Sequence, residues 1–358
     1  MQKVMWIVLG TIGLLAAGHG SAQPQLIPLR RPPGAAMGPT VKLTPLGSLD
    51  GEFCRNDRAM LFEDPSGVRV LYDPGRTING GTDARLGAVH VMLLSHPHAD
   101  HIGDAIPNTS SPGTCASPGT VPATPNSNFA QIAAAKASAV FVGGELATYL
   151  ARKIQDVSGG TTATCDANGL TNEQVVPRSS PCTEALRPGG SATARLDGAA
   201  TGVKIATVQA IHSDGIPATL TDSPGVAPGT AAYGGAENGY ILKFTNGLTV
   251  YLSGDTGLFG DMDTIVRGYY RANLMVINMG DVATTGPDEA AFAVRRLVRP
   301  QTVIPSHINE AATTKGQPTG PRIKEFLSQM GRSNIGVVLP LSGITREFDG
   351  SGNCVNCQ

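Results

Sequence analysis

Charged and aromatic side chains are scarce in this chain. Only 15% of its 358 residues are charged, 5% are aromatic, and the formal net charge is −1. Proteins that bind nucleic acid usually carry a basic stripe, so this composition argues against a nucleic-acid partner. After Gly18, no segment has the roughly 20 consecutive apolar residues that a membrane-spanning helix needs. We therefore expect no stable membrane span and a small molecule as the partner.

Histidine is also rare, whereas apolar residues, glycine and proline are plentiful. The chain has seven histidines, and hydrophobic residues make up 41% of it, which is enough for a sizeable core. Its 45 glycines and 26 prolines imply many turns and long loops. Six cysteines are typical of a protein from an oxidising compartment.

The first residues predict a secretory signal. Lys3 is a short positive start, residues 4–18 are apolar, and residues 20–22 are a small-residue cleavage site. A membrane anchor is the alternative, but the apolar run is short for one. We therefore expect a signal peptide over residues 1–22, a Pro-rich arm over residues 23–40, and export to the periplasm or the cell exterior.

The cysteines can pair in many ways, and the sequence does not choose among them. Cys354 and Cys357 form one CxxC; because a metal ribbon needs a second such pair, a C-terminal disulfide is the favoured interpretation. Cys115 lies in an irregular stretch at 105–128, and Cys165 and Cys182 lie in another at 157–200. A disulfide between these two loop insertions is one hypothesis.

Short apolar runs separated by turn residues predict alternating strands and helices in one domain over residues 41–358. Residues 88–95 form a nearly continuous apolar run, which is typical of a strand buried on both faces. The other predicted strands are 68–72, 139–142, 203–211, 239–244, 248–253, 274–278, 302–305 and 336–341. The predicted helices are 129–136, 144–154, 289–298 and 323–330.

The strongest chemical signal directly follows the strand at 88–95. Four side chains that can bind metal fall within six residues: His96, His98, Asp100 and His101. Residues at i and i+2 of an extended segment point the same way, so the first two imidazoles can share one ion and the next two side chains can bind another. Zinc-like cations bind imidazole nitrogen and carboxylate oxygen readily. A polar surface loop is the alternative, but three of the seven histidines lie here.

This HxHxDH segment resembles the signature of the metallo-β-lactamase superfamily. The resemblance implies an α/β fold, namely a four-layer αβ/βα sandwich with two divalent metal ions at one edge. Zinc is the expected metal, with manganese or iron as alternatives. The implied ligands are His96, His98 and His212 for one ion, Asp100, His101 and His307 for the other, and Asp255 as the bridge. Asp255 and Asp100 would be catalytic, with a metal-bridging hydroxide as the nucleophile.

Three further runs are similar to the branch of L-ascorbate-6-phosphate lactonase and the phospholipase D that acts on N-acyl-phosphatidylethanolamine. They are residues 254–262, 277–281 and 286–291. The resemblance implies an exported hydrolase of an ester, lactone or phosphodiester. The alternatives are a β-lactam hydrolase or nuclease of the same fold, an iron redox enzyme, and a non-catalytic metal-binding scaffold.

Other polar residues near these segments have less certain roles. His90 is interpreted as a core histidine, and Asp73 as a turn former or a partner of a ligand histidine. Asp104 is a candidate for a ligand partner or a helix cap. Three residues that follow the late strands are candidates for the substrate rim: Asp281, Asn309 and Glu310. For Asn309 and Glu310, a solvated loop is the alternative.

Overall fold

The structure is a computed structural model that describes residues 38–109, 111, 115, 119–165, 172–220, 231–331 and 333–357. The predicted signal peptide and nearly all of the Pro-rich arm lie outside these residues. Among the described helices, none has both the length and the apolar character needed to cross a bilayer.

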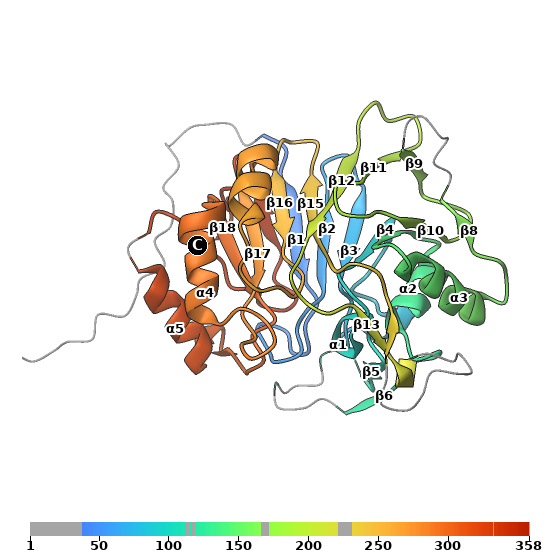
Figure 1. Ribbon diagram of the computed structural model, residues 1–358, viewed down its shortest axis with the longest axis horizontal. Helices are drawn as coiled ribbons and strands as arrows, with labels where there is room; N and C mark the ends of the chain where they lie inside the picture. The colour runs from blue at the N-terminus through green and yellow to red at the C-terminus, as the bar shows by residue number, and fades with distance from the viewer. Residues whose placement is uncertain are drawn as a thin grey trace, which may run out of the picture.

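Two large mixed sheets form the centre of the described part of the chain (Figure 1). The first has eight strands in the order β22 (Arg346–Phe348), β1 (Val41–Pro45), β2 (Met60–Glu63), β3 (Arg69–Tyr72), β4 (Val91–Leu94), β7 (Ala139–Val142), β10 (Cys182–Ala185) and β8 (Ala163–Thr164). The second has eight in the order β21 (Gly336–Val337), β18 (Thr302–Ser306), β17 (Leu274–Asn278), β16 (Thr249–Leu252), β15 (Asn238–Lys243), β12 (Val203–Gln209), β11 (Ser191–Leu196) and β9 (Glu173–Val176).

The two sheets pack face to face because each presents a row of apolar side chains to the other. Val91 and Leu93 of β4 share one core with Leu242 of β15 and Val250 of β16. The intervening β4 residues, of which Met92 is one, face the opposite side and are equally buried. The prediction of a strand buried on both faces is therefore confirmed.

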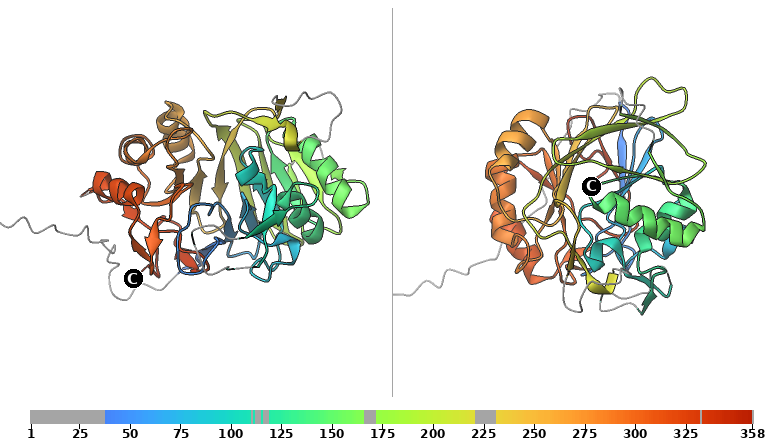
Figure 2. Two further views of the ribbon diagram at one scale, coloured as in Figure 1. Left: turned by 90° about the horizontal axis from the view of Figure 1, so that it is seen from below. Right: turned by 45° about the vertical axis from the view of Figure 1, so that its right-hand side comes forward.

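Helices cover the outer face of each sheet (Figure 2). On the first sheet they are α2 (Asn128–Lys136) and α3 (Leu146–Ser158). On the second they are the π-helical η3 (Met262–Tyr270), α4 (Pro287–Phe292), the π-helical η4 (Ala293–Val298) and α5 (Pro321–Met330). The predicted four-layer αβ/βα sandwich is confirmed. The helix η3 was missed by the sequence prediction.

The segment 157–200 is not the irregular loop that its composition suggested. It contains β8, β9, β10 and β11, which extend both sheets at the same end of the sandwich. Buried residues alternate with more exposed ones in β9 and β11, whereas β8 is exposed and half of β10 is only partly buried. These strands therefore lack the continuous apolar runs of the central strands. The 105–128 stretch holds a small hairpin of β5 (Ala105–Pro107) and β6 (Thr120–Pro122).

The proposed disulfide between the two insertions is wrong. Cys115 pairs with Cys54, and Cys165 pairs with Cys182. Cys165 and Cys182 flank paired strands of one sheet, whereas Cys115 is brought to the loop after β1, which no sequence pattern reveals. Cys354 and Cys357 form the expected C-terminal disulfide.

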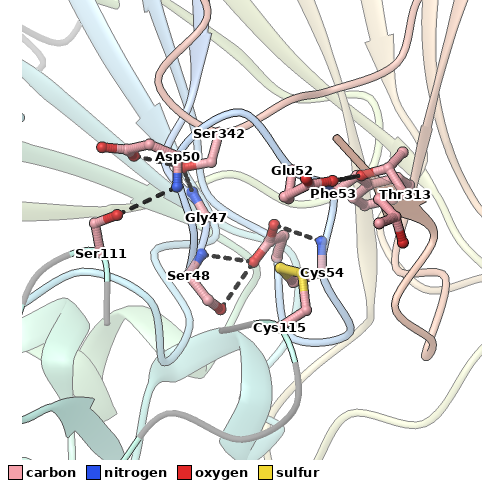
Figure 3. The surroundings of a disulfide bond; sticks show 12 residues. Gly47, Ser48, Asp50, Glu52, Phe53, Cys54, Ser111, Cys115, Thr313 and Ser342 are labelled. Carbon is pink, nitrogen blue, oxygen red and sulfur yellow. Dashed lines mark hydrogen bonds between the residues drawn. A yellow bond between two sulfur atoms is a disulfide. The ribbon is translucent and has the colours of Figure 1, made fainter. Parts of the chain in front are cut away.

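The disulfide of Cys54 and Cys115 braces a loop that is already rich in hydrogen bonds (Figure 3). The Asp57 carboxylate accepts hydrogen bonds from the Ser48 and Cys54 backbone N–H groups and from the Ser48 hydroxyl. The Asp50 N–H donates to Ser111 of the insertion. The loop is therefore held on both sides.

Two hairpins and two short helices complete the loops of the described fold. They are the hairpin of β13 (Gly215–Pro217) and β14 (Ala231–Tyr233), the hairpin of β19 (Thr313–Thr314) and β20 (Gln317–Pro318), and the short helices η1 (Gly80–Thr82) and η2 (Ala218–Leu220).

Serine in place of both Cys54 and Cys115 should lower the free energy of unfolding by roughly 4 kcal/mol, because this bridge closes a loop between residues 61 apart. Serine at Cys354 and Cys357, which are 3 apart, should cost only about 2 kcal/mol on the same chain-entropy account. Urea unfolding of the two double variants tests this order. Equal losses from the two pairs would contradict it.

Candidate metal centre

The sandwich brings the carboxyl ends of several strands to one edge. In the first sheet β4 is parallel to β3 and β7, and in the second β16, β17 and β18 are parallel. Strand β12 shares their direction, since it is antiparallel to β15 and β15 is antiparallel to β16. The loops after these strands therefore meet, as ligand-binding loops do in other open α/β sheets.

All seven predicted ligand side chains lie on these loops. His96 and His98 follow β4, and Asp100 and His101 lie in the single-turn α1 (Ala99–Ile102), which Figure 1 shows at this edge. The other three follow the ends of β12, β16 and β18: His212, Asp255 and His307.

The Asp255 carboxylate lies at the centre of the group. Its Oδ2 is 3.1 Å from His307 Nε2 and 3.4 Å from His101 Nε2. The same oxygen is 3.8 Å from His212 Nε2 and 3.9 Å from His96 Nε2. A single carboxylate oxygen thus lies near four imidazole nitrogens that come from three loops, those after β4, β12 and β18.

The remaining donors fall into two groups on either side of Asp255. His98 Nδ1 is 3.3 Å from His212 Nε2, and these two with His96 have ligand atoms within 4.8 Å of one another. Asp100 Oδ2 is 3.2 Å from His307 Nε2 and 3.8 Å from His101 Nε2, and these three meet the same limit.

The donors fit divalent cations. The Nε2 atoms of His96 and His101 and the Oδ1 of Asp255 are buried and have no hydrogen-bond partner in the described structure. Buried polar groups normally have partners, so these atoms point to a ligand. A cavity of about 10 Å³ lies against His101, Asp255 and His307 and has room for one small ion or water. Imidazole and carboxylate donors suit zinc, manganese or iron.

Asp73 orients two of the predicted ligand histidines, one directly and one through Ser95. Its Oδ2 accepts a hydrogen bond from His101 Nδ1 at 2.8 Å, and its carboxylate also accepts from the backbone N–H and hydroxyl of Ser95. Ser95 Oγ in turn lies 3.0 Å from His96 Nδ1. Such contacts fix the tautomer and orientation of a ligand imidazole. Of the two roles considered for Asp73, the structure supports that of a partner to a ligand histidine.

Arg58 is a site residue that the sequence did not reveal. Its side chain is only 3% exposed, and its Nη2 donates to Asp100 Oδ2 at 3.1 Å and to Asn309 Oδ1 at 3.0 Å. Nothing in the run from Cys54 to Arg58 distinguishes this arginine from its neighbour Arg55, because only the tertiary fold aims it at Asp100. Asn309, expected at the substrate rim, thus contacts this guanidinium.

Two other residues expected near the site serve elsewhere. Asp104 pairs with Arg76, with Oδ1 2.5 Å from Nε, so it contacts no ligand histidine in the described structure. Glu310 accepts hydrogen bonds from the backbone N–H groups of Arg322 and Ile323 and caps α5. Its role is structural, because those N–H groups have no partner within the helix.

His90 and Asp281 lie outside the cluster. His90 Nδ1 accepts the Arg69 N–H at 3.0 Å, so this histidine has a hydrogen-bond partner, but it is half-buried just before β4 and is not a core residue. Asp281 is exposed on the loop after β17, where its Oδ1 accepts the Val282 N–H. That position agrees with a rim residue, although no contact with a ligand side chain is present in the described structure.

Several residues other than glycine around the centre have a positive φ, which is a rare backbone conformation for such residues. Asp73 has φ 40°, His307 has φ 48° and Asn309 has φ 58°. Left-handed backbone in residues other than glycine persists only where the surroundings enforce it, and it gathers at functional sites. Gly280 is required for a different reason, because a Cβ there would lie 2.6 Å from His307 Nδ1.

Burial and neighbouring charges shift the pKa values of the histidines at the site in different directions. Burial, and then the nearby imidazoles, lower the pKa of His96, and burial followed by His212 lowers the pKa of His98 to about 4. Burial opposes the charge on His101 as well, but the carboxylates of Asp255, Asp100 and Asp73 outweigh it and raise the His101 pKa. Without a bound cation, a proton on His101 therefore compensates the buried carboxylates.

Comparisons with known proteins agree with this geometry. The family described as "Beta-lactamase superfamily domain" matches residues 56–307, which include all seven clustered side chains. A UPF0173 metal-dependent hydrolase of Cupriavidus necator is 29% identical over 324 residues, or 88% of this chain and 92% of its own. Another, from Koribacter versatilis, is 28% identical over 263 residues, which cover 71% of this chain and 82% of that relative. The structure of a metallo hydrolase from Ignicoccus hospitalis is similar in fold, with a TM-score of 0.53 and 22% identity, over 87% of this chain and 99% of its own.

Asp73→Asn should weaken metal binding about 10- to 100-fold, because the neutral amide loses the charge that orients and polarises His101. Asparagine tolerates the left-handed backbone of this position, so folding should survive. Competition with a chromogenic chelator measures the affinity. Asp64→Asn is the matched control, since Asp64 is also buried but bonds to Ser66 and Thr245. Wild-type affinity in Asp73→Asn would exclude this role.

Metal binding should release protons and strengthen as the pH rises. Because the pKa of His101 is raised, its imidazole is protonated near neutral pH in the metal-free protein, and a ligand nitrogen must lose that proton. Titration calorimetry in buffers of different ionisation enthalpy counts the released protons. Binding without proton release would show that His101 is not a ligand.

Proposed function

The chain belongs to the beta-lactamase superfamily, and from this we propose that it uses two divalent metal ions to hydrolyse an ester, lactone or phosphodiester. It is a metal-dependent hydrolase of the metallo-β-lactamase fold. The observation that carries the two-metal proposal is the position of Asp255 Oδ2, within 3.9 Å of four imidazole Nε2 atoms that belong to two donor groups.

The proposed ligand sets follow the two donor groups. One ion is assigned to His96, His98 and His212, the other to Asp100, His101 and His307, and Asp255 lies between the groups. Zinc is the expected metal on the donor chemistry. Neutral imidazoles on one side and anionic carboxylates on the other are the protonation states that such binding needs.

Bound ions of this kind lower the pKa of a water and polarise the oxygen of the attacked group. The chain's own residues supply the rest. Asp100 would accept a hydrogen bond from the attacking water, and Arg58 holds that carboxylate in place through the 3.1 Å contact. Asp73 and Ser95 keep the histidines oriented, so that little rearrangement is needed during reaction.

Export is part of the same proposal. Every cysteine is paired in the structure, in bridges that an oxidising compartment favours. The N-terminal sequence has the pattern of a cleavable signal. Periplasmic or extracellular fractions should contain a chain that begins at Gln23, which N-terminal sequencing of the fractionated protein tests. A cytoplasmic chain that keeps residues 1–22 would refute export.

The central test combines metal analysis with one ligand variant. The wild-type protein should contain about two zinc-like ions per chain and hydrolyse at least one class in a panel of chromogenic esters, lactones and bis-aryl phosphodiesters. His98→Ala should lose one ion and at least about 100-fold in kcat/KM, because the attacking water loses its activation. His90→Gln is the control, since His90 lies outside the cluster and glutamine keeps an acceptor for the Arg69 N–H.

Two results would overturn the proposal. Full activity of His98→Ala on every substrate would contradict the proposed mechanism. A single ion per wild-type chain would contradict the two-metal centre. Iron together with oxygen consumption would favour a redox enzyme instead.

A further inference from the structure

Three loops beside the candidate metal centre each present an exposed aliphatic side chain. Ile211, Leu258 and Val282 are 45%, 39% and 99% exposed. We call these three residues the aliphatic rim. Large apolar side chains exposed together beside a site mark a surface that is covered when a ligand binds.

Backbone hydrogen bonds tie the three loops together. The Ile211 N–H donates to Thr256 Oγ1 at 2.9 Å, and the Gly257 N–H donates to the Ile211 carbonyl at 3.0 Å. The Thr285 N–H donates to the Thr256 carbonyl at 3.0 Å, which attaches the third loop. The rim residues are thus carried on one connected surface.

That surface adjoins the proposed ligands directly. Ile211 precedes His212, and Leu258 follows Asp255 by three residues. The backbone of Ala283, which follows Val282, hydrogen-bonds the His212 side chain. A substrate whose reacting group lies at the centre therefore has the aliphatic rim within reach of its substituents.

Val282 is held outward by a strained backbone. Its φ is 65°, in the left-handed region, which a β-branched residue rarely occupies. Asp281, directly before it, has φ 62°. Strain of this kind persists at ligand sites, where it is part of the function. Glycine or asparagine would remove it, so the valine points to a use for its side chain.

Apart from the proposed metal ions, the described side chains around the centre offer little positive charge to an anionic phosphate group. Arg58 is the one arginine or lysine among the described residues lining the cavity beside the centre, and its Nη2 is engaged by Asp100 and Asn309. Glu237, which accepts the His212 N–H, and Asp281 add negative charge nearby. Phosphate recognition usually uses accessible arginine, lysine or helix N-termini.

We infer that the substrate is a neutral carboxylic ester or lactone whose aliphatic chain lies on the rim of Ile211, Leu258 and Val282. This inference rests on the proposed hydrolytic function and selects among its substrate classes. Water adds to the acyl carbon, the acyl C–O bond breaks, and the leaving oxygen takes a proton. The products are a carboxylic acid and an alcohol, joined in one molecule if the substrate is a lactone.

The test compares 4-nitrophenyl octanoate with 4-nitrophenyl acetate. The wild-type protein should prefer the octanoate in kcat/KM, and Val282→Asn and Ile211→Asn should each lower this preference about five- to tenfold. Asparagine tolerates the left-handed backbone at 282, so only the apolar surface is lost. Ile211→Val should keep most of the preference. Val157→Asn, on the exposed end of α3 away from the site, is the control and should change neither rate.

A binding measurement separates this inference from the hydrolytic proposal. Calorimetry with decanoate on the purified holoenzyme should show binding that Val282→Asn weakens severalfold and Val157→Asn does not. The role proposed for the aliphatic rim would be wrong if both asparagine variants kept the chain-length preference. It would also be wrong if bis-aryl phosphodiesters were cleaved faster than esters. Failure to hydrolyse any substrate, with decanoate binding still dependent on Val282, would instead overturn the hydrolytic proposal alone.

Discussion

The structure depends on one electrostatic constraint, which is the burial of the Asp255 carboxylate among four imidazoles. An isolated carboxylate is costly to bury, and it is tolerated only when cations or donors compensate its charge. His101 supplies that compensation through its raised pKa in the metal-free protein, and the proposed pair of cations would supply it when bound. The seven side chains, their partners and the loops that carry them are arranged around this requirement.

The sandwich meets the constraint by separating rigid support from functional loops. Parallel strands from both sheets end at the same edge, so side chains far apart in sequence converge without long insertions. Behind them, Asp73 and Arg58 orient His101 and Asp100. The left-handed backbone at His307 shows that strain is accepted where a ligand must be aimed.

Residues that act through contacts between distant segments were the hardest to identify. Asp73 was recognised only as one of two possibilities, because a turn aspartate has the same local sequence whether or not it meets a histidine. Arg58 was missed, since it lies 42 residues before Asp100 and has no motif of its own. The partner of Cys115 was wrong for the same reason, and the edge strands within 157–200 were missed because short half-exposed strands have weak apolar patterns.

The sequence by itself predicted a metal-binding cluster, and its resemblance to the metallo-β-lactamase signature predicted the fold class that the structure confirms. The spacing of His96, His98, Asp100 and His101 after a doubly buried strand is a local pattern, and local patterns are legible because strand geometry dictates which side chains share a face. Only the tertiary structure decided which residues support those ligands and which side chains surround them. Arg58 and Asn309 meet through packing of the two sheets, and the aliphatic rim gathers loops that follow three strands of the second sheet. Both depend on contacts that no single stretch of sequence contains.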